Sequence, residues 1–148
     1  MSSELDDFVE SLQEKIIEET RRSYGEKVIE RWMNPRFMER IADADGHSMI
    51  RGVCGDSMEF FLVFESERVS KAAFMTDGCG STTACGSVAA EMAFGKGPEE
   101  LLDITADAIE SCLDGLPEAE KHCALLAATS LQEALHDYML RQRKQAEA

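Results

Sequence analysis

The start of the chain carries apolar residues at the spacing of an amphipathic helix. They recur every three or four residues and predict a helix from residue 4 to about residue 33. Gly25 is costly inside a helix, so we expect a break into two helices beside it. Asn34-Pro35 ends the region, because the residue before a proline avoids the α conformation. The apolar positions of the first helix are Leu5, Phe8, Val9, Leu12, Ile16 and Ile17.

The hydrophobic period changes after an irregular loop over residues 36–47. Three short segments rich in β-branched and aromatic residues follow, separated by turn sequences. Tight turns join neighbouring antiparallel strands, so this pattern predicts a three-stranded antiparallel sheet. The predicted strands are residues 48–53, 57–65 and 69–76.

The rest of the chain has helical patterns. Residues 80–94 are rich in Ala, Ser, Thr and Gly, and such small residues let a helix pack closely on a sheet. Pro98 suits the first turn of the next helical stretch, which extends to about Leu113 in two pieces around Thr105. A last helix is expected from about Pro117 to Arg143. Its expected apolar stripe is Leu125, Leu126, Leu131, Leu135, Tyr138 and Met139.

These elements predict one α+β domain: a three-stranded antiparallel sheet packed against helices, with an added N-terminal amphipathic helix. We place the helical extension at residues 1–23 and the main domain at residues 24–148. The apolar stripe of the extension is expected to pack against this chain or a second copy. The length of 148 residues suits one domain, and 44% apolar with 30% charged residues is typical of a soluble globular protein.

The net charge of the chain limits the kinds of molecule that we expect it to bind. Twenty-nine acidic and 15 basic residues give a net charge of −14. Nucleic acids and anionic membranes attract Lys and Arg, so neither is an expected partner, whereas metal cations or a basic protein suit this charge. Residues 97–120 hold eight acidic residues and no Lys or Arg, and we interpret them as a solvated helical face. The absence of a long apolar run or a signal-peptide pattern predicts a cytoplasmic location.

Three of the five cysteines are expected at turns or helix starts. Cys54 lies in Cys-Gly-Asp between two strands, Cys79 lies in Gly-Cys-Gly before a helix, and Cys123 follows His122 near the start of the last helix. The odd number and the missing export signal argue against a disulfide framework and favour metal or thiol chemistry. Helix N-termini stabilise thiolates. No Cys-x-x-Cys pair is present, so the spacing alone leaves both a metal site and unrelated cysteines open.

Four stretches of the chain occur in a fixed order. They are Tyr24-Gly-Glu-Lys-Val-Ile-Glu-Arg-Trp32-Met-Asn34-Pro35-Arg36, Cys54-Gly55-Asp56-Ser-Met58, Gly78-Cys79-Gly80-Ser81 and His122-Cys123-Ala-Leu-Leu-Ala. Together they resemble the iron–sulfur cluster assembly scaffold family, namely the IscU type and the N-terminal domain of NifU. The resemblance extends from about Tyr24 to Tyr138, and it implies a fold with a three-stranded antiparallel sheet and packed helices.

The resemblance implies a scaffold, not an enzyme, on which a transient [2Fe–2S] cluster is built from iron and desulfurase-derived sulfur and then transferred. The implied partners are a cysteine desulfurase, apo iron–sulfur acceptor proteins and a second copy in a homodimer. Three thiolates with one weaker oxygen or nitrogen ligand suit a cluster that has to leave, and zinc fits the same tetrahedral set. The implied ligands are Cys54, Asp56, Cys79, His122 and Cys123, with Cys123 and Cys54 as sulfur-accepting candidates.

Two comparisons with the family pattern refine this prediction. Leu116-Pro117-Glu118-Ala119-Glu120 stands where the IscU type has a chaperone-binding Leu-Pro-Pro-Val-Lys stretch, which argues against recognition by the Hsp70-type chaperone. The zinc-dependent sulfur-acceptor branch has an insertion between its second and third cysteines and lacks the histidine. This chain shows neither feature, which favours the scaffold branch.

The other cysteines and histidines have structural interpretations. Cys85 lies six residues after Cys79, about 240° around a helix, so we expect it to point away from the site and pack in the helix. Cys112 is also expected to be structural, His47 to lie on a loop surface and His136 on a helix face. Two alternative functions remain: an enzyme with a Cys–His pair, or a zinc-binding sulfur-acceptor or structural zinc protein of the same fold.

Overall fold

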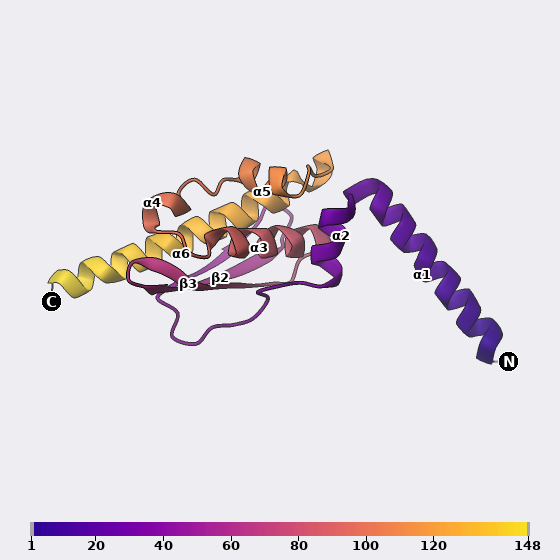
Figure 1. The fold of residues 1–148 in the computed structure, drawn as a ribbon, viewed down its shortest axis with the longest axis horizontal. Helices are drawn as coiled ribbons and strands as arrows, with labels where there is room; N and C mark the ends of the chain where they lie inside the picture. Colours follow the sequence, from indigo (N-terminus) through magenta and orange to yellow (C-terminus); the bar gives the residue numbers. More distant parts are fainter. Residues whose placement is uncertain (1, 148) are drawn as a thin grey trace.

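The computed structural model describes the backbone of residues 2–147 and most of their side chains (Figure 1). The side chains of Ile17 and Tyr24, together with those of residues 2 and 20–23, lie outside the described set. The elements are α1 (Ser2–Tyr24), α2 (Glu26–Met33), β1 (Gly46–Arg51), β2 (Ser57–Glu65), β3 (Arg68–Thr76), α3 (Gly80–Ala93), α4 (Pro98–Leu101), α5 (Ala106–Cys112), the 3₁₀ helix η1 (Glu118–Glu120) and α6 (Lys121–Glu147).

The sheet is antiparallel with strand order β1-β2-β3, as the turn spacing predicts. Phe60 in the central strand pairs with Ser48 on one side and Phe74 on the other. A register irregularity at Val63/Phe64 precedes the β2–β3 turn. The predicted α+β class and the break of the N-terminal helix at Gly25 are both confirmed.

Helices α3 and α6 cover one face of the sheet and enclose the main core (Figure 1). Every residue from 80 to 90 is buried, which explains the many small residues in α3. Gly86 allows α3 to approach β3 closely, because a Cβ at that position would lie 2.5 Å from Cδ2 of Phe74. The large side chains of this core include Met58, Phe60, Leu62, Val88, Ile109, Leu131 and Leu135.

The other face of the sheet is covered in part by the loop between α2 and β1. Ala44 of this loop packs on Phe61 and Ala73 of the strands. His47 was expected on a loop surface, but that interpretation is wrong: it lies in β1, and its Nε2 is 2.7 Å from Oε2 of Glu59. The reason is that β1 begins two residues earlier than the alternating pattern predicts.

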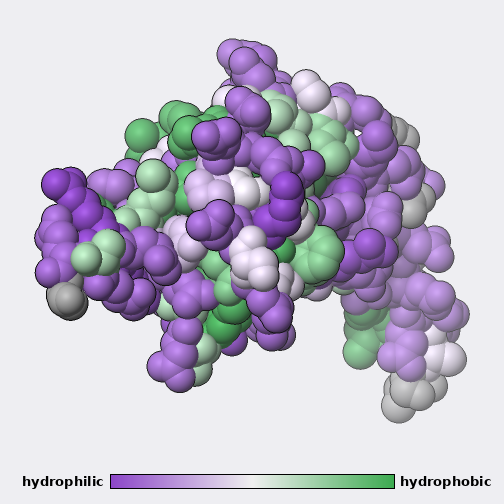
Figure 2. Space-filling model, turned by 60° about the vertical axis from the view of Figure 1, so that its left-hand side comes forward, coloured by the Kyte–Doolittle hydropathy of each residue, from purple (hydrophilic) through white to green (hydrophobic). Residues whose placement is uncertain are grey.

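Helix α1 leads away from the rest of the molecule (Figure 1). Its predicted apolar stripe is between 47% and 65% exposed, so the expected packing of this stripe against the chain is wrong. Packing against a second copy stays a prediction. Apolar side chains show on this descending arm in Figure 2, whereas most of the surface in that view is hydrophilic. The stripe consists of Leu5, Phe8, Leu12 and Ile16.

Helix α6 is the longest helix to pack on the sheet, and its stripe differs in part from the predicted one. Leu131 and Leu135 are buried as predicted, but Leu125 and Met139 are exposed. Within the described residues, no helix combines the length and apolar character needed to cross a bilayer.

Candidate metal centre

One end of the sheet gathers the three segments that carry the predicted site residues. β1 ends and β2 begins there, on either side of a turn over residues 52–56. β3 ends at the same edge, because Thr76 pairs with Met58. The turn after β3 is tied to the first turn by the Ser57 N–H, which donates to Oδ1 of Asp77 at 2.7 Å. The antiparallel order therefore brings residues far apart in sequence to one place.

Cys79 and Cys123 meet at the N-termini of two helices. Cys79 is the N-cap residue of α3, and Cys123 lies in the first turn of α6, as predicted. Thr82, one turn into α3, is completely buried between them. Its Oγ1 is 3.6 Å from Sγ of Cys79 and 3.3 Å from Sγ of Cys123. The same hydroxyl donates to Oδ2 of Asp56 at 3.2 Å, so Thr82 connects three predicted site residues.

Glu120 completes this cluster from the other side. Its Oε2 is 3.5 Å from Sγ of Cys123 and 3.9 Å from Sγ of Cys79. Among the described residues, Cys79, Glu120 and Cys123 are the only group of three or more His, Cys, Asp and Glu residues whose ligand atoms all lie within 4.8 Å of one another. Sequence reasoning missed Glu120 and Thr82. Each lies three residues from a site cysteine, and that helical spacing is the signal that could have found them.

The remaining predicted ligands lie around this group. Asp56 reaches it through Thr82, and its carboxylate lies against Gly78, where a Cβ would be 2.9 Å from Oδ2. His122 Nε2 is 3.6 Å from Sγ of Cys123. Cys54 is exposed on the β1–β2 turn and does not join the three-residue group. Of the three cysteines among the implied ligands, the structure therefore brings Cys79 and Cys123 together and leaves Cys54 outside this group.

Comparison with known proteins assigns the fold and the family. The sequence profile described as the NifU-like N terminal domain matches residues 23–145. The chain belongs to this family.

Curated relatives cover most of the NifU-like chain. It is 41% identical over 122 residues to the iron-sulfur cluster assembly scaffold protein IscU 1 of Archaeoglobus fulgidus, covering 82% of this chain and 80% of that one. It is 35% identical over 128 residues to the iron-sulfur cluster assembly scaffold protein IscU of Aquifex aeolicus, with 84% and 82% covered. A crystal structure of a nitrogen-fixing NifU-like protein (N-terminal) from Brucella abortus has the same fold, with a TM-score of 0.65, 18% identity, and 82% and 97% covered.

Burial shifts the pKa of the Cys123 thiol in this NifU-like domain. Burial is the largest of the effects that together raise the pKa of the Cys123 thiol to about 12, and the neighbouring Thr82 hydroxyl acts in the opposite direction. Cys79 and Glu120, when charged, act in the same direction as burial. Cys123 is therefore a protonated thiol at neutral pH when no metal is bound, and a metal ion must displace that proton to bind the sulfur.

The two other cysteines of the NifU-like domain are part of its packing. Cys85 is completely buried in the main core, and burial holds the pKa of its thiol well above its usual range. Cys112 is half-buried and packs against the same core from α5. His136 lies on the exposed side of α6, as expected, with Nδ1 3.8 Å from Oε2 of Glu133.

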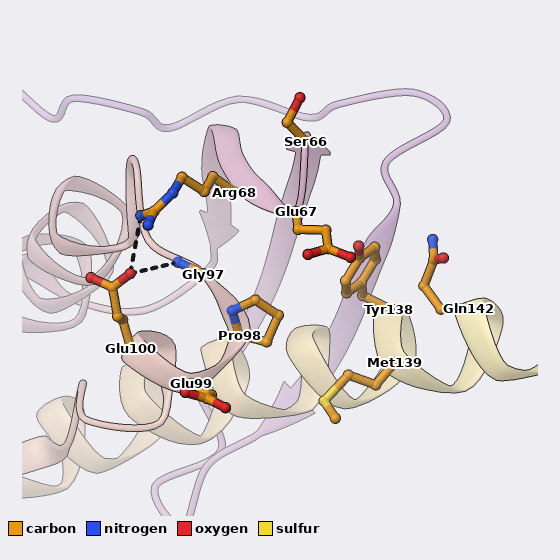
Figure 3. Close-up of a pocket in the computed structure, with 10 residues that line it drawn as sticks. All are labelled: Ser66, Glu67, Arg68, Gly97, Pro98, Glu99, Glu100, Tyr138, Met139 and Gln142. Atoms are coloured by element: carbon orange, nitrogen blue, oxygen red, sulfur yellow. Dashed lines mark hydrogen bonds and ion pairs between the residues drawn. The ribbon is translucent and has the colours of Figure 1, made fainter.

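A separate pocket of the NifU-like domain lies at the opposite end of the sheet (Figure 3). It is formed by the β2–β3 turn, the start of α4 and the second half of α6. Oε1 of Glu100 accepts hydrogen bonds there from Arg68 and from the Gly97 N–H. Tyr138 in this pocket stacks on Phe64, with ring centroids 3.7 Å apart. The residues that line this pocket include no cysteine or histidine.

Proposed function

We propose that this chain is a scaffold for iron–sulfur cluster assembly. The observation that carries the proposal is the meeting of Cys79 and Cys123 at the N-termini of α3 and α6, with carboxylates beside them. Thiolates are the ligands that iron in sulfide-bridged clusters prefers. The names of the relatives from Archaeoglobus fulgidus and Aquifex aeolicus describe the same role.

The cargo in this proposal is a [2Fe–2S] cluster, held by Cys54, Cys79 and Cys123. Cys54 lies on an exposed turn flanked by glycines, with φ of 88° at Gly55, so its thiol is accessible to a partner protein. We propose that a cysteine desulfurase supplies sulfur to Cys54 or Cys123 and that apo-proteins receive the finished cluster. The chain's own role is to hold iron and sulfide without performing the desulfuration.

The labile corner of the cluster is proposed to be Asp56 or His122. An oxygen or nitrogen ligand holds a sulfide-bridged iron less firmly than a thiolate does, which favours release. Asp56 is two residues from Cys54, and its Oδ2 is bonded to Thr82 within the cysteine cluster. Asp56→Cys should therefore retain the cluster longer and slow its transfer to an apo-ferredoxin, while assembly continues. A transfer rate equal to the parent's would exclude Asp56 as the labile corner.

Anaerobic reconstitution tests the scaffold function directly. The full chain is incubated with ferrous iron, cysteine, a cysteine desulfurase and dithiothreitol, which supplies the electrons that reduce the transferred sulfur to sulfide. The visible absorption of a [2Fe–2S] cluster is followed. Cys79→Ser should abolish that absorption. Cys112→Ser is the matched control, because Cys112 packs against the core away from the cysteine cluster, and it should assemble the cluster as the parent does.

The second half of the test is delivery of the cluster to an apo-ferredoxin. A chain that gains the cluster and loses it to the ferredoxin is a scaffold. A chain that binds zinc tightly but gains no visible absorption under the same conditions would instead be the zinc-binding protein of this fold, and the scaffold proposal would be wrong.

A further inference from the structure

One acidic residue of the segment over residues 97–120 lies within the cysteine cluster. Glu110 and Glu118 both pair with Lys121, and Asp114 pairs with Lys27. The carboxylate of Glu120 lies beside two thiols, at 3.5 Å and 3.9 Å. The expected solvated face therefore describes its neighbours but not Glu120.

The local backbone fixes Glu120 in this position. It ends the 3₁₀ helix η1, and its N–H donates to the carbonyl of Pro117 at 2.8 Å. Helix α6 continues directly from it, and Cys123 follows three residues later. The carboxylate and the Cys123 thiol therefore lie on the same side of one continuous helical segment.

The separation of the three donor atoms suits a single tetrahedral ion. With metal–sulfur bonds of about 2.3 Å and metal–oxygen bonds of about 2.1 Å, a tetrahedral site has sulfur–oxygen edges of about 3.6 Å. The two observed sulfur–oxygen distances, 3.5 Å and 3.9 Å, lie close to that value.

We propose that Glu120 is a metal ligand, and that Cys79, Glu120 and Cys123 bind one divalent iron or zinc ion without Cys54. Two thiolates and one carboxylate are a donor set of mixed softness that both ions accept. The fourth position stays open on the side of His122 and Asp56. This inference deepens the proposed scaffold function by naming the site that takes the first ion.

The arrangement separates two events on the scaffold. The first ion needs no movement of the β1–β2 turn, because its three ligands are already together. Cys54 is exposed and outside this group, so its thiol stays available while the ion is held. The turn then has to close over the ion only when the cluster itself is built.

Cobalt titration of the full-length, reduced, metal-free chain tests the role of Glu120. Thiolate-to-cobalt absorption reports binding, and Zn²⁺ competition gives the affinity. Glu120→Gln keeps the shape but removes the anionic oxygen, and it should weaken binding at least about tenfold. Glu118→Gln is the matched control, two residues away and paired with Lys121, and it should stay within about twofold of the parent.

X-ray absorption of the zinc-loaded parent provides a second measurement that needs no variant. The proposal requires two sulfur ligands, and the same two in Cys54→Ser, which should nevertheless lose cluster assembly. Three sulfur ligands, or parental cobalt affinity in both Glu120→Gln and Glu120→Ala, would overturn it. Circular dichroism melting confirms that each variant is folded. Cluster reconstitution is scored separately: ion binding through Glu120 without cluster formation would refute the scaffold function and leave the ligand assignment intact.

Discussion

Gly80, next to Cys79, is the position where the docking of α2 on α3 can be tested most directly. Gly80 is the first residue of α3, and a Cβ there would overlap the indole ring of Trp32 from α2. Gly80→Ala must therefore displace the ring. Trp32 is 41% exposed, so the ring has room to move outward rather than forcing the helices apart.

The cost of this displacement follows from the area that the ring covers. A tryptophan side chain offers up to roughly 250 Å² and about three-fifths of Trp32 is covered, so complete displacement would expose roughly 150 Å² and cost about 3–4 kcal/mol. Alanine recovers at most about 1 kcal/mol of helix propensity. We expect Gly80→Ala to lower the free energy of unfolding by about 1–3 kcal/mol, with partial movement at the lower end.

Urea unfolding followed by fluorescence measures both consequences, because Trp32 is the only tryptophan of the chain. The midpoint should fall by roughly 1 M, and the emission of the folded state should shift to the red. Gly86→Ala is the matched control in the same helix: its Cβ would press on Phe74, so it should destabilise without moving the emission. Parental emission and midpoint in Gly80→Ala would refute the packing argument.

Three further predictions concern other parts of the molecule. Thr82→Val removes the hydroxyl bonded to Asp56 but keeps the side-chain shape, so it should cost about 1 kcal/mol in urea unfolding and shorten the lifetime of a reconstituted cluster; an unchanged lifetime would contradict this. The pKa of Cys85 is raised by burial, so its contribution to stability is complete below the ordinary thiol pKa of 9.0 and is lost as pH rises above it. Cys85→Ala should accordingly show a shallower loss of unfolding free energy above that pH, and an identical slope would argue against a buried neutral thiol. Deleting residues 1–22 should change the Tm of the main domain by less than about 2 °C, because the α1 stripe is exposed; a larger fall in a calorimetric scan would show that this helix supports the core.

The sequence predicted the sheet and the helices that cover it because their signals are local. Each signal lies within the segment whose secondary structure it predicts. These signals are the alternation in the strands, the small residues of α3 and Pro98 at the start of α4. The start of β1 was misplaced because it depends on a distant contact. Gly46 begins the strand where the backbone of Ala134 on α6 approaches so closely that a Cβ would overlap its carbonyl oxygen. No pattern near Gly46 carries that information.

The sequence identified Cys79 and Cys123 of the candidate site, but it did not identify Thr82 and Glu120, which contact both of them. Cys79 and Cys123 were found because turns and helix starts carry sequence signals. Glu120 was assigned to a solvated face, since seven similar acids precede it and only the 3₁₀ turn at η1 directs its carboxylate inward. Thr82 is one of many small residues in α3, so the sequence around it does not single it out. Its role follows from its hydrogen bond to Asp56, which lies on the β1–β2 turn.

The projecting helix α1 unfolds independently of the rest of the chain. Helix α1 has 23 residues, and those of its side chains that the structure describes are exposed, so its stability comes from its own hydrogen bonds, which leave an isolated helix of this length marginal in water. The hydrogen bonds of α1 can therefore break while the core stays folded. Amide hydrogens of α1 should exchange with solvent orders of magnitude faster than those of α3 and the central strand, in two well-separated populations. A single free energy of unfolding then describes the body alone, and the N-terminal segment is free to order when a partner surface supplies the missing contacts.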